Sequence, residues 1–369
     1  MTDPTDVPSP ATAEGALVAT VARIAPLDET AMAAASAHLD RLTKPPGSLG
    51  RLEAVAIQLA GIRGQVAPVV EHRAIVVAAA DHGVTRQGVS AYPTEVTAQM
   101  VANFLAGGAA IDVLAAGLGA RLTVLDVGVA GPIPDRGGPG VVTYLERRIR
   151  AGTGDLSTGP AMSRDEAWRA IGVGLDLAAD LAADGVDLLG VGEMGIGNTT
   201  AASAIAAVFS GRPAAEVTGR GTGLADDALA HKIVVVDAAL ARHRPEPGDP
   251  IGVLAAVGGL EIGALAGLIL GAAAARIPVV LDGFITASAA LLAARLAPCL
   301  PARLLAGHRS VEPGHALVLE ALGLRPLLDL DLRLGEGTGA ALAMGLVVAA
   351  ARLRDGMATF ASAEVAGPG

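Results

Sequence analysis

The sequence predicts an α/β protein whose parallel sheet is covered by helices on both faces, with a small helical unit ahead of it. Short runs rich in Val, Leu and Ile end at Asp, Gly or Glu and are followed by helix-like stretches, which is typical of buried parallel strands. Residues 28–62 show helical spacing with no strand between. The 369 residues are 52% apolar and only 2% aromatic, which predicts a core of thin side chains with closely packed backbones.

Six segments have the composition of buried strands that end at polar or glycine residues. They are residues 74–83, 121–129, 186–193, 278–284, 303–307 and 327–337. A further strand is possible at residues 141–145, inside the Gly/Pro-rich stretch 131–159. Ser163 and Glu166 have the spacing of a capping box, which predicts a helix running from there toward Asp184.

The first 20 residues are expected to form a disordered polar tail. They carry Asp and Pro without the basic flank and apolar centre of a signal peptide, which favours a cytoplasmic protein. Helical spacing then predicts a helix over residues 28–42, which the Lys-Pro-Pro-Gly segment at 44–47 ends. Ser48 is expected to cap a second helix over residues 49–62.

Charge and cysteine content exclude several classes of protein. The net charge of −10 lacks the basic footprint of a nucleic-acid-binding protein. One cysteine, Cys299, leaves no intramolecular disulfide and no cysteine-based zinc cluster. Residues 251–275 are long enough to cross a membrane. Because Glu261 lies within this run and Gly258 and Gly259 interrupt it, we expect two buried helices and no membrane partner.

Polar residues and glycines gather where the predicted strands end. In a parallel sheet, ligands bind outside the carboxyl ends of the strands, so we expect a functional site there. The strand-end segments are 81–83 (Asp-His-Gly), 192–195 (Gly-Glu-Met-Gly), 282–283 (Asp-Gly), 307–310 (Gly-His-Arg-Ser) and 335–337 (Gly-Glu-Gly).

The segment 190–195 fits the pattern G-x-G-x-x-G, with Glu216 about 20 residues further on, as a dinucleotide site requires. The residues that follow, Asn198, Thr199 and Thr200, add hydrogen-bond donors at a helix N-terminus and favour a single phosphate group. A purely structural glycine turn is the third interpretation, since the chain contains 48 glycines.

Two more segments carry candidate chemistry. The loop TGRGTG at 218–223 is rich in backbone donors, and Lys232 on the next helix could complete an anion cradle; a solvated helix cation is the alternative. Glu336 lies between glycines, which allow a ligand to approach and desolvate it toward the pKa of a general base; a surface glutamate that serves solubility is the alternative. His308, Glu312 and His315 do not have the spacing of a metal site.

Six ordered strings together resemble the nicotinate-nucleotide–dimethylbenzimidazole phosphoribosyltransferases, and they extend over nearly the whole chain after about residue 20. The strings are LTKPPGSLGRLE (42–53), residues 79–111 from AADHGVTRQG onward, GVGEMGIGNTTAASA (190–204), TGRGTG (218–223), LDGFITASAAL (281–291) and residues 307–344 from GHRSVEPGHA to LGEGTGAALAM.

The resemblance implies transfer of the phosphoribosyl group of nicotinate mononucleotide to 5,6-dimethylbenzimidazole, with inversion at the anomeric carbon and without a metal or cofactor. It implies Glu336 as the general base. It also implies nucleotide contacts from Glu193, Gly195, Asn198, Thr199, Lys232 and Ser310, and an acceptor pocket containing Ser90, Gln99, Met194 and Leu334.

The resemblance further implies a homodimer with a Rossmann-like catalytic domain (71–339) and a small helical domain (21–70) that the C-terminal helix, about 340–369, completes. Two other functions are compatible with the motifs. One is an NAD(P)-dependent oxidoreductase that uses residues 190–195, and the other is a sensor that binds nicotinate nucleotide without catalysis.

Overall fold

A computed structural model of the chain describes residues 7–134 and 140–366. Within them a six-stranded sheet runs in the order β3-β2-β1-β4-β5-β6, and every neighbouring pair is parallel. This is the strand order of a Rossmann fold, so the predicted fold class is confirmed. The strands are β3 (Thr143–Glu146), β2 (Arg121–Gly128), β1 (Arg73–Ala80), β4 (Leu188–Met194), β5 (Val279–Leu281) and β6 (Leu304–Ala306).

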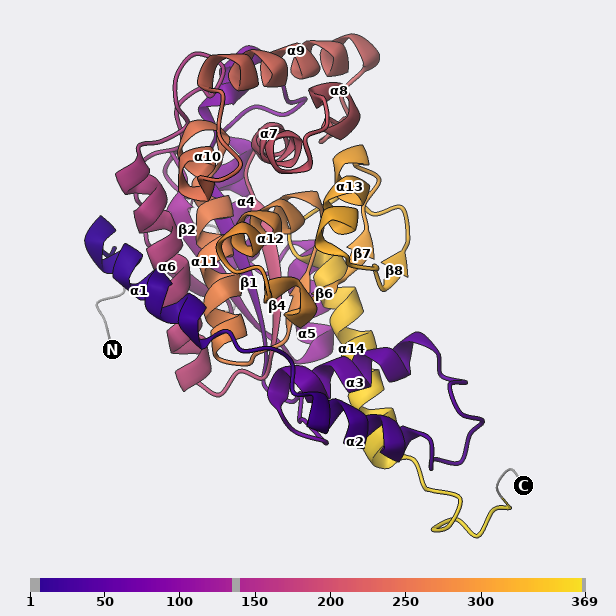
Figure 1. Ribbon diagram of the computed structural model, residues 1–369. Helices are drawn as coiled ribbons and strands as arrows, with labels where there is room; N and C mark the ends of the chain where they lie inside the picture. Colours follow the sequence, from indigo (N-terminus) through magenta and orange to yellow (C-terminus); the bar gives the residue numbers. More distant parts are fainter. Residues whose placement is uncertain (1–6, 135–139, 367–369) are drawn as a thin grey trace.

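Helices cover both faces of the sheet (Figure 1). Alternate residues of β1 point to opposite faces: Ile75 and Val77 belong to one buried cluster, Val76 and Ala78 to the other. The larger cluster contains residues of α1 (Pro10–Arg23), α6 (Arg164–Ala183), α7 (Asn198–Ser210), α10 (Pro250–Val257), α11 (Leu260–Ala274) and α12 (Phe284–Leu296). The other contains residues of α3 (Arg51–Arg63), α4 (Val96–Leu105), α5 (Ala110–Leu118) and α14 (Thr338–Gly356).

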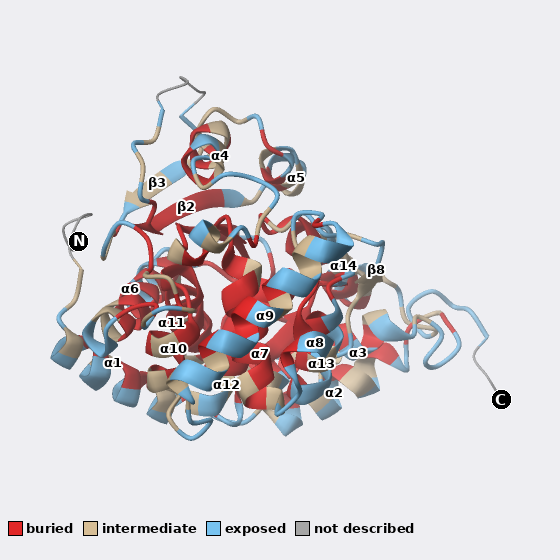
Figure 2. Ribbon diagram, turned by 90° about the horizontal axis from the view of Figure 1, so that it is seen from above, coloured by how far each residue is buried: buried red, intermediate tan, exposed pale blue. Residues whose placement is uncertain are grey.

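Glycines allow the closest helix contact in the core. A Cβ at Gly174 of α6 would lie 1.9 Å from the carbonyl oxygen of Ala264, and one at Gly267 of α11 would lie 2.0 Å from that of Ile171. The backbones of α6 and α11 are therefore in direct contact, as the low aromatic content predicts. Figure 2 shows α7 and α11 as buried helices, while α1 and α9 (Asp226–His243) carry exposed residues on their outer sides.

A small helical unit projects from the main body (Figure 1). It consists of α2 (Glu29–Leu39), α3 and the far end of α14. An antiparallel bridge joins Leu42, which follows α2, to Thr359, which follows α14, so the N-terminal helices and the C-terminal segment meet here. Lys44, in the loop between α2 and α3, forms a buried ion pair of 2.8 Å with Glu53 in the first turn of α3. The domain limits named above stay predictions.

Two predictions about the N-terminal region are wrong. Residues 10–20 do not belong to a disordered tail, because they lie in α1, whose Ala13 and Leu17 are buried against α6 and α11. Residues 1–6 of that predicted tail lie outside the described residues. Ser48 does not cap α3, which begins after Gly50 without a side-chain cap. Asp28 does cap α2, accepting a hydrogen bond from the backbone of Ala31.

The prediction that residues 327–337 form a strand of the main sheet is also wrong. Only Leu328 and Asp329 are extended there, as β8 (Leu328–Asp329), which pairs with β7 (His308–Arg309) in a separate two-stranded sheet. Asp331 and Gly335 have positive φ angles of 54° and 82°, which interrupt an extended chain. The main sheet is instead completed by β3, which lies close to the possible strand predicted at residues 141–145 in the Gly/Pro-rich stretch.

The apolar run 251–275 folds as two helices, α10 and α11, that break at Gly258 and Gly259 and are almost entirely buried. The capping box of Ser163 and Glu166 at the start of α6 is also confirmed. One described segment, Val96–Leu118, has the length and hydropathy of a membrane-crossing helix. It folds as two helices of 10 and 9 residues, each about half of the roughly 20 residues that a span requires.

The remaining elements surround the carboxyl ends of the strands or connect them. These are η1 (Gly83–Gln87), α8 (Ala214–Val217), η2 (Leu300–Arg303) and α13 (Pro313–Leu322).

Candidate active site

A cavity of about 420 Å³ lies beyond the carboxyl ends of the central strands. The strand order reverses direction between β1 and β4, and such a switch point leaves a crevice where ligands bind. The predicted site at the strand ends is therefore a real cavity. Eight of the predicted site residues line it, namely Glu193, Met194, Gly195, Asn198, Thr199, Ser310, Leu334 and Glu336.

The glycine pattern at 190–195 does not form a dinucleotide turn. Gly190 and Gly192 lie within β4, and α7 begins only at Asn198. A Cβ at Gly192 would lie 2.4 Å from the backbone nitrogen of Gly337. Glycine is needed here because the loop that carries Glu336 lies directly against the strand. The NAD(P) interpretation loses its structural basis.

Glu193 ends β4 inside the cavity and is 6% exposed. The side-chain amide of Asn198 donates a hydrogen bond to its carboxylate. Burial raises the pKa of Glu193 to about 8, and the charges of Asp282, Glu261 and Glu336 add to the rise. This carboxyl group is therefore mostly protonated at neutral pH and can donate a hydrogen bond to a sugar or phosphate oxygen.

Lys232 of α9 does not itself line the cavity but lies behind Thr199, a lining residue. Its side chain is fully buried, and Nζ donates hydrogen bonds to Oγ1 of Thr199 (2.7 Å) and to the carbonyl of Gly219 (3.2 Å). The alternative of a solvated helix cation is wrong. Burial lowers the pKa of Lys232 to about 8 against the opposing charge of Glu312. The backbone N–H of Gly221 donates to Glu312 at 2.8 Å.

Glu336 has a backbone conformation that residues other than glycine rarely adopt. Its φ is 64°, and the flanking Gly335 and Gly337 have φ of 82° and 86°; a non-glycine residue there costs about 1–3 kcal/mol. The side chain is 5% exposed, and Oε2 has no hydrogen-bond partner among the described residues. Burial raises the pKa of Glu336 to about 7, with help from Asp112 and Asp282.

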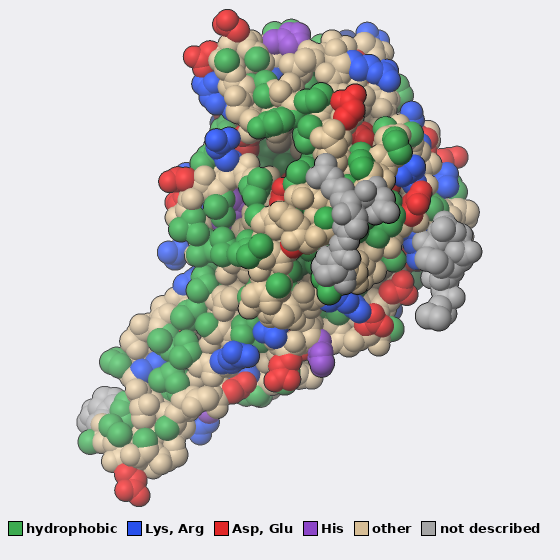
Figure 3. Space-filling view, turned by 180° about the vertical axis from the view of Figure 1, so that it is seen from behind, with side chains coloured by type: hydrophobic (Ala, Val, Ile, Leu, Met, Phe, Trp, Pro, Cys, Tyr) green, Lys and Arg blue, Asp and Glu red, His purple; other side chains and the backbone are tan. Residues whose placement is uncertain are grey.

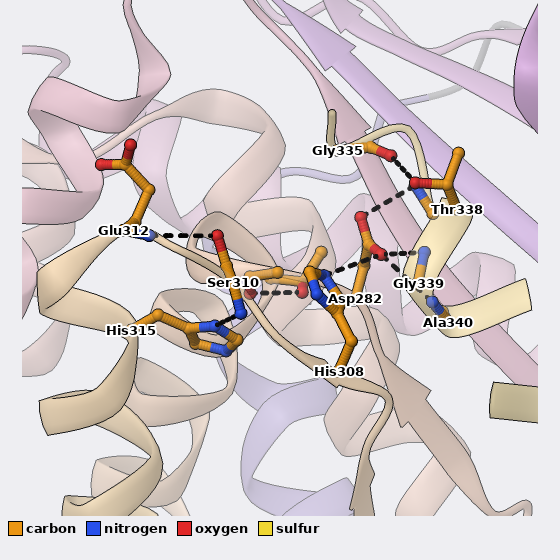
Figure 4. A network of polar contacts seen from close by, with 12 residues as sticks. Asp282, His308, Ser310, Glu312, His315, Gly335, Thr338, Gly339 and Ala340 are labelled. Atoms are coloured by element: carbon orange, nitrogen blue, oxygen red, sulfur yellow. Dashed lines mark hydrogen bonds and ion pairs between the residues drawn. The ribbon is translucent and has the colours of Figure 1, made fainter. Parts of the chain in front are cut away.

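The segment 308–315 forms one wall of the cavity and is drawn in Figure 4. Ser310 is buried, its backbone N–H donates to Nδ1 of His315 (3.0 Å), and its Oγ accepts from the backbone of Glu312 (3.3 Å). Burial lowers the pKa of His315 to about 3, so its neutral ring accepts this bond. His308 lies edge-on to His315 and beside Asp282. These side chains support each other and the loop.

The predicted acceptor pocket is only partly assembled. Met194 and Leu334 line the cavity, with Leu334 exposed at its rim. Ser90 lies nearby on the loop before α4, where its Oγ contacts Oγ1 of Thr222, a lining residue. Gln99 is exposed on α4 and does not line the cavity.

Several apolar lining residues were not predicted from the sequence. Tyr92, Val96 and Met100 follow one another at four-residue intervals and so share one side of the segment that leads into α4, a spacing that is visible in the sequence. Phe284 and Ile285 begin α12 and have no local signal that marks them. Together these residues give the cavity the flat apolar walls that suit an aromatic ring.

The two sides of the cavity therefore differ in their chemistry. One side holds the start of α7 at Asn198 and Thr199, with the buried ammonium group of Lys232 directly behind Thr199. The other side is apolar and contains Glu336, whose buried carboxylate oxygen is free to take up a proton. A base with a pKa near 7 can act at neutral pH.

Comparisons with known proteins agree with this arrangement. A family model described as phosphoribosyltransferase matches residues 24–365. A protein of Chloroflexus aggregans named nicotinate-nucleotide–dimethylbenzimidazole phosphoribosyltransferase is 58% identical, with 95% of this chain and 98% of the relative covered. The protein of the same name from Geobacter metallireducens is 54% identical over 95% of this chain and 98% of its own length. The crystal structure of CobT from Thermus thermophilus has a TM-score of 0.86 at 53% identity and covers 92% of this chain and 100% of its own. The chain belongs to this phosphoribosyltransferase family.

Proposed function

We propose that the protein transfers the phosphoribosyl group of nicotinate mononucleotide to 5,6-dimethylbenzimidazole. The products are α-ribazole 5′-phosphate and nicotinate, and the configuration at the anomeric carbon is inverted. This reaction prepares the lower ligand of cobalamin. The observation that carries the proposal is the buried carboxylate of Glu336, whose Oε2 has no partner within residues 7–134 and 140–366, in a partly apolar cavity with Lys232 buried behind its opposite side.

The reaction needs one base and no acid. The leaving group is a pyridinium nitrogen that departs as a neutral ring nitrogen, so no proton must be supplied to it. The attacking benzimidazole nitrogen becomes positive as it bonds to the anomeric carbon. Glu336 relieves this charge by removing the proton from the other ring nitrogen. The remaining barrier is lowered by holding both rings in line with the anomeric carbon.

The nucleotide contacts follow from the same geometry. The backbone at Gly195, the N-terminus of α7 at Asn198 and Thr199, and the ammonium group of Lys232 surround the phosphate and ribose in this proposal. Glu193, protonated at neutral pH, donates to a ribose hydroxyl or the phosphate. Ser310 binds the carboxylate of the nicotinate.

The test is product analysis with a matched pair of variants. The wild-type protein, incubated with nicotinate mononucleotide and 5,6-dimethylbenzimidazole, is expected to form α-ribazole 5′-phosphate, detected by mass. Glu336→Gln keeps the shape of the side chain but cannot accept the proton, so turnover should fall at least 100-fold while nucleotide binding stays within about threefold. Glu71→Gln changes an exposed carboxylate and serves as the control.

The other functions make different predictions in the same assay. A sensor would bind nicotinate mononucleotide but release no nicotinate with any acceptor. An oxidoreductase would form no α-ribazole 5′-phosphate and would instead show a nicotinamide absorbance change once NAD(P)H and an oxidised substrate are supplied. Wild-type turnover by Glu336→Gln would remove the assigned base. A panel of benzimidazoles, purines and phenols in place of the single acceptor would define which bases the apolar walls admit.

We also propose that the protein is a cytoplasmic homodimer. An apolar hollow of about 530 Å³ runs along α14, lined by Val348, Leu353 and Met357 among others. Figure 3 shows hydrophobic side chains gathered along the edge that leads from the main body to the projecting helical unit. Burial of such a surface favours association. Light scattering after size-exclusion chromatography should give twice the mass of the 369-residue chain.

A further inference from the structure

The N-terminus of α14 lacks a cap from its own sequence. The N-cap residue is Gly337, and no side chain of the flanking segment accepts a hydrogen bond from the first turn. The first turn of a helix exposes N–H groups that need acceptors. This first turn follows Glu336 directly, so whatever satisfies it also determines where the proposed base lies.

Asp282 supplies the missing acceptor from another strand. It follows β5, is 1% exposed, and accepts three backbone N–H groups. Its Oδ2 accepts from Gly337 (3.1 Å), and its Oδ1 accepts from Gly339 (2.7 Å) and Ala340 (3.1 Å). Figure 4 shows the carboxylate of Asp282 directed at the start of α14. Burial raises the pKa of Asp282, whereas His308 and the three N–H donors oppose this rise and favour the ionised form, in which both oxygens accept.

The same carboxylate sits next to the strained turn. Glu336 is joined to Gly337, and its backbone N–H also donates to the carbonyl of Glu193 at 3.3 Å. Beside Asp282, His308 packs so closely against the first turn of α14 that a Cβ at Gly339 would lie 1.9 Å from its ring. The turn is therefore held between β4, β5 and β7, and Asp282 makes three of these contacts.

We propose that Asp282 is a positioning residue that clamps the turn carrying Glu336 and sets the charge around it. This inference rests on the proposed function. The titratable groups around Glu336 are Asp282 from β5, Glu193 from β4 and Asp112 from α5, with His308 from β7 beside Asp282. The charges of Asp112 and Asp282 oppose ionisation of Glu336, whereas Glu193 is mostly protonated at neutral pH. Removal of the charge of either aspartate therefore lowers the pH at which Glu336 ionises.

Two variants separate the clamp from the charge. Asp112 accepts a hydrogen bond from the backbone of Ala109 at the start of α5 and makes none to the turn. Asp112→Asn therefore removes a charge alone. The wild-type rate, measured as kcat/KM against pH, should fall below about pH 7. Asp112→Asn should move this acid limb to lower pH by about half a unit and keep the plateau of kcat within about twofold.

Asp282→Asn should move the acid limb in the same direction and also lower the plateau of kcat at least tenfold, because an amide cannot accept all three N–H groups and a displaced base loses rate steeply. A folded Asp282→Asn protein with the wild-type plateau would overturn the clamp. An unchanged acid limb in that variant would overturn the role of its charge.

Hydrogen exchange on the wild-type protein gives a second test that requires neither variant nor turnover. The amides of Gly337, Gly339 and Ala340 should exchange at least 100-fold more slowly than those of the exposed Val66 and Val69. Rapid exchange would overturn the clamp even if Asp282→Asn fails to fold. Absence of α-ribazole 5′-phosphate with the wild-type protein would refute the proposed function, while the exchange result would still decide whether Asp282 holds the turn.

Discussion

Replacement of Glu336 by Gln should make the protein more stable while it removes turnover. Burial raises the pKa of Glu336 from its ordinary 4.5 to about 7. The folded protein therefore holds a proton between these two pH values that the unfolded chain has released. Above pH 7 the side chain is ionised in both states, and the folded state bears the cost of a buried carboxylate. Gln has the shape of the protonated form and carries no such cost.

The size of the effect follows from the pKa. At 1.36 kcal/mol for each pKa unit, the raised pKa of Glu336 lowers the free energy of unfolding of the wild-type protein by about 3 kcal/mol at pH 8. Glu336→Gln removes this loss. With an unfolding entropy of about 2.1 cal/mol/K per residue and 369 residues, this raises Tm by about 4 °C. Below about pH 4.5 the carboxylate is protonated in both states, so the difference should vanish.

Differential scanning calorimetry of wild type and Glu336→Gln at pH 8 and at pH 4.5 measures this directly. Glu71→Gln changes an exposed carboxylate and should show no comparable difference between the two pH values. A Glu336→Gln protein that is less stable than wild type at pH 8, or whose advantage is the same at both pH values, would refute the burial argument.

Two further predictions test the phosphate side and the core. Lys232→Met removes the buried ammonium that contacts Thr199; we expect affinity for nicotinate mononucleotide, measured by calorimetry, to fall about 10- to 100-fold, with Tm unchanged or higher because a costly buried charge is lost. Unchanged affinity would contradict this role. Gly174→Ala places a methyl group 1.9 Å from the carbonyl of Ala264 and should lower the free energy of unfolding by about 1–3 kcal/mol or more. Gly117→Ala, which meets no atom within 4 Å, should not.

Local pattern was sufficient for much of the fold. The strands at 74–83, 121–129 and 186–193 are correct because buried parallel strands are apolar on both faces and end sharply at polar residues. The break in 251–275 followed from Gly258 and Gly259. The segment 327–337 misled because its alternation of Leu with charged residues resembles a strand, whereas it runs mostly outside both sheets.

The sequence by itself determined that polar residues such as Glu193, Asp282 and Glu336 stand at or beside the ends of predicted strands and loops, since these signals depend on neighbours in the chain. Only the tertiary structure decided that Glu193 and Glu336 line one cavity and that Asp282 holds the backbone next to Glu336, because strand order and helix packing bring together segments up to 143 residues apart. Their raised pKa values and the three hydrogen bonds to Asp282 arise from that packing. Burial and electrostatic proximity are properties of the assembled fold, and no local pattern contains them.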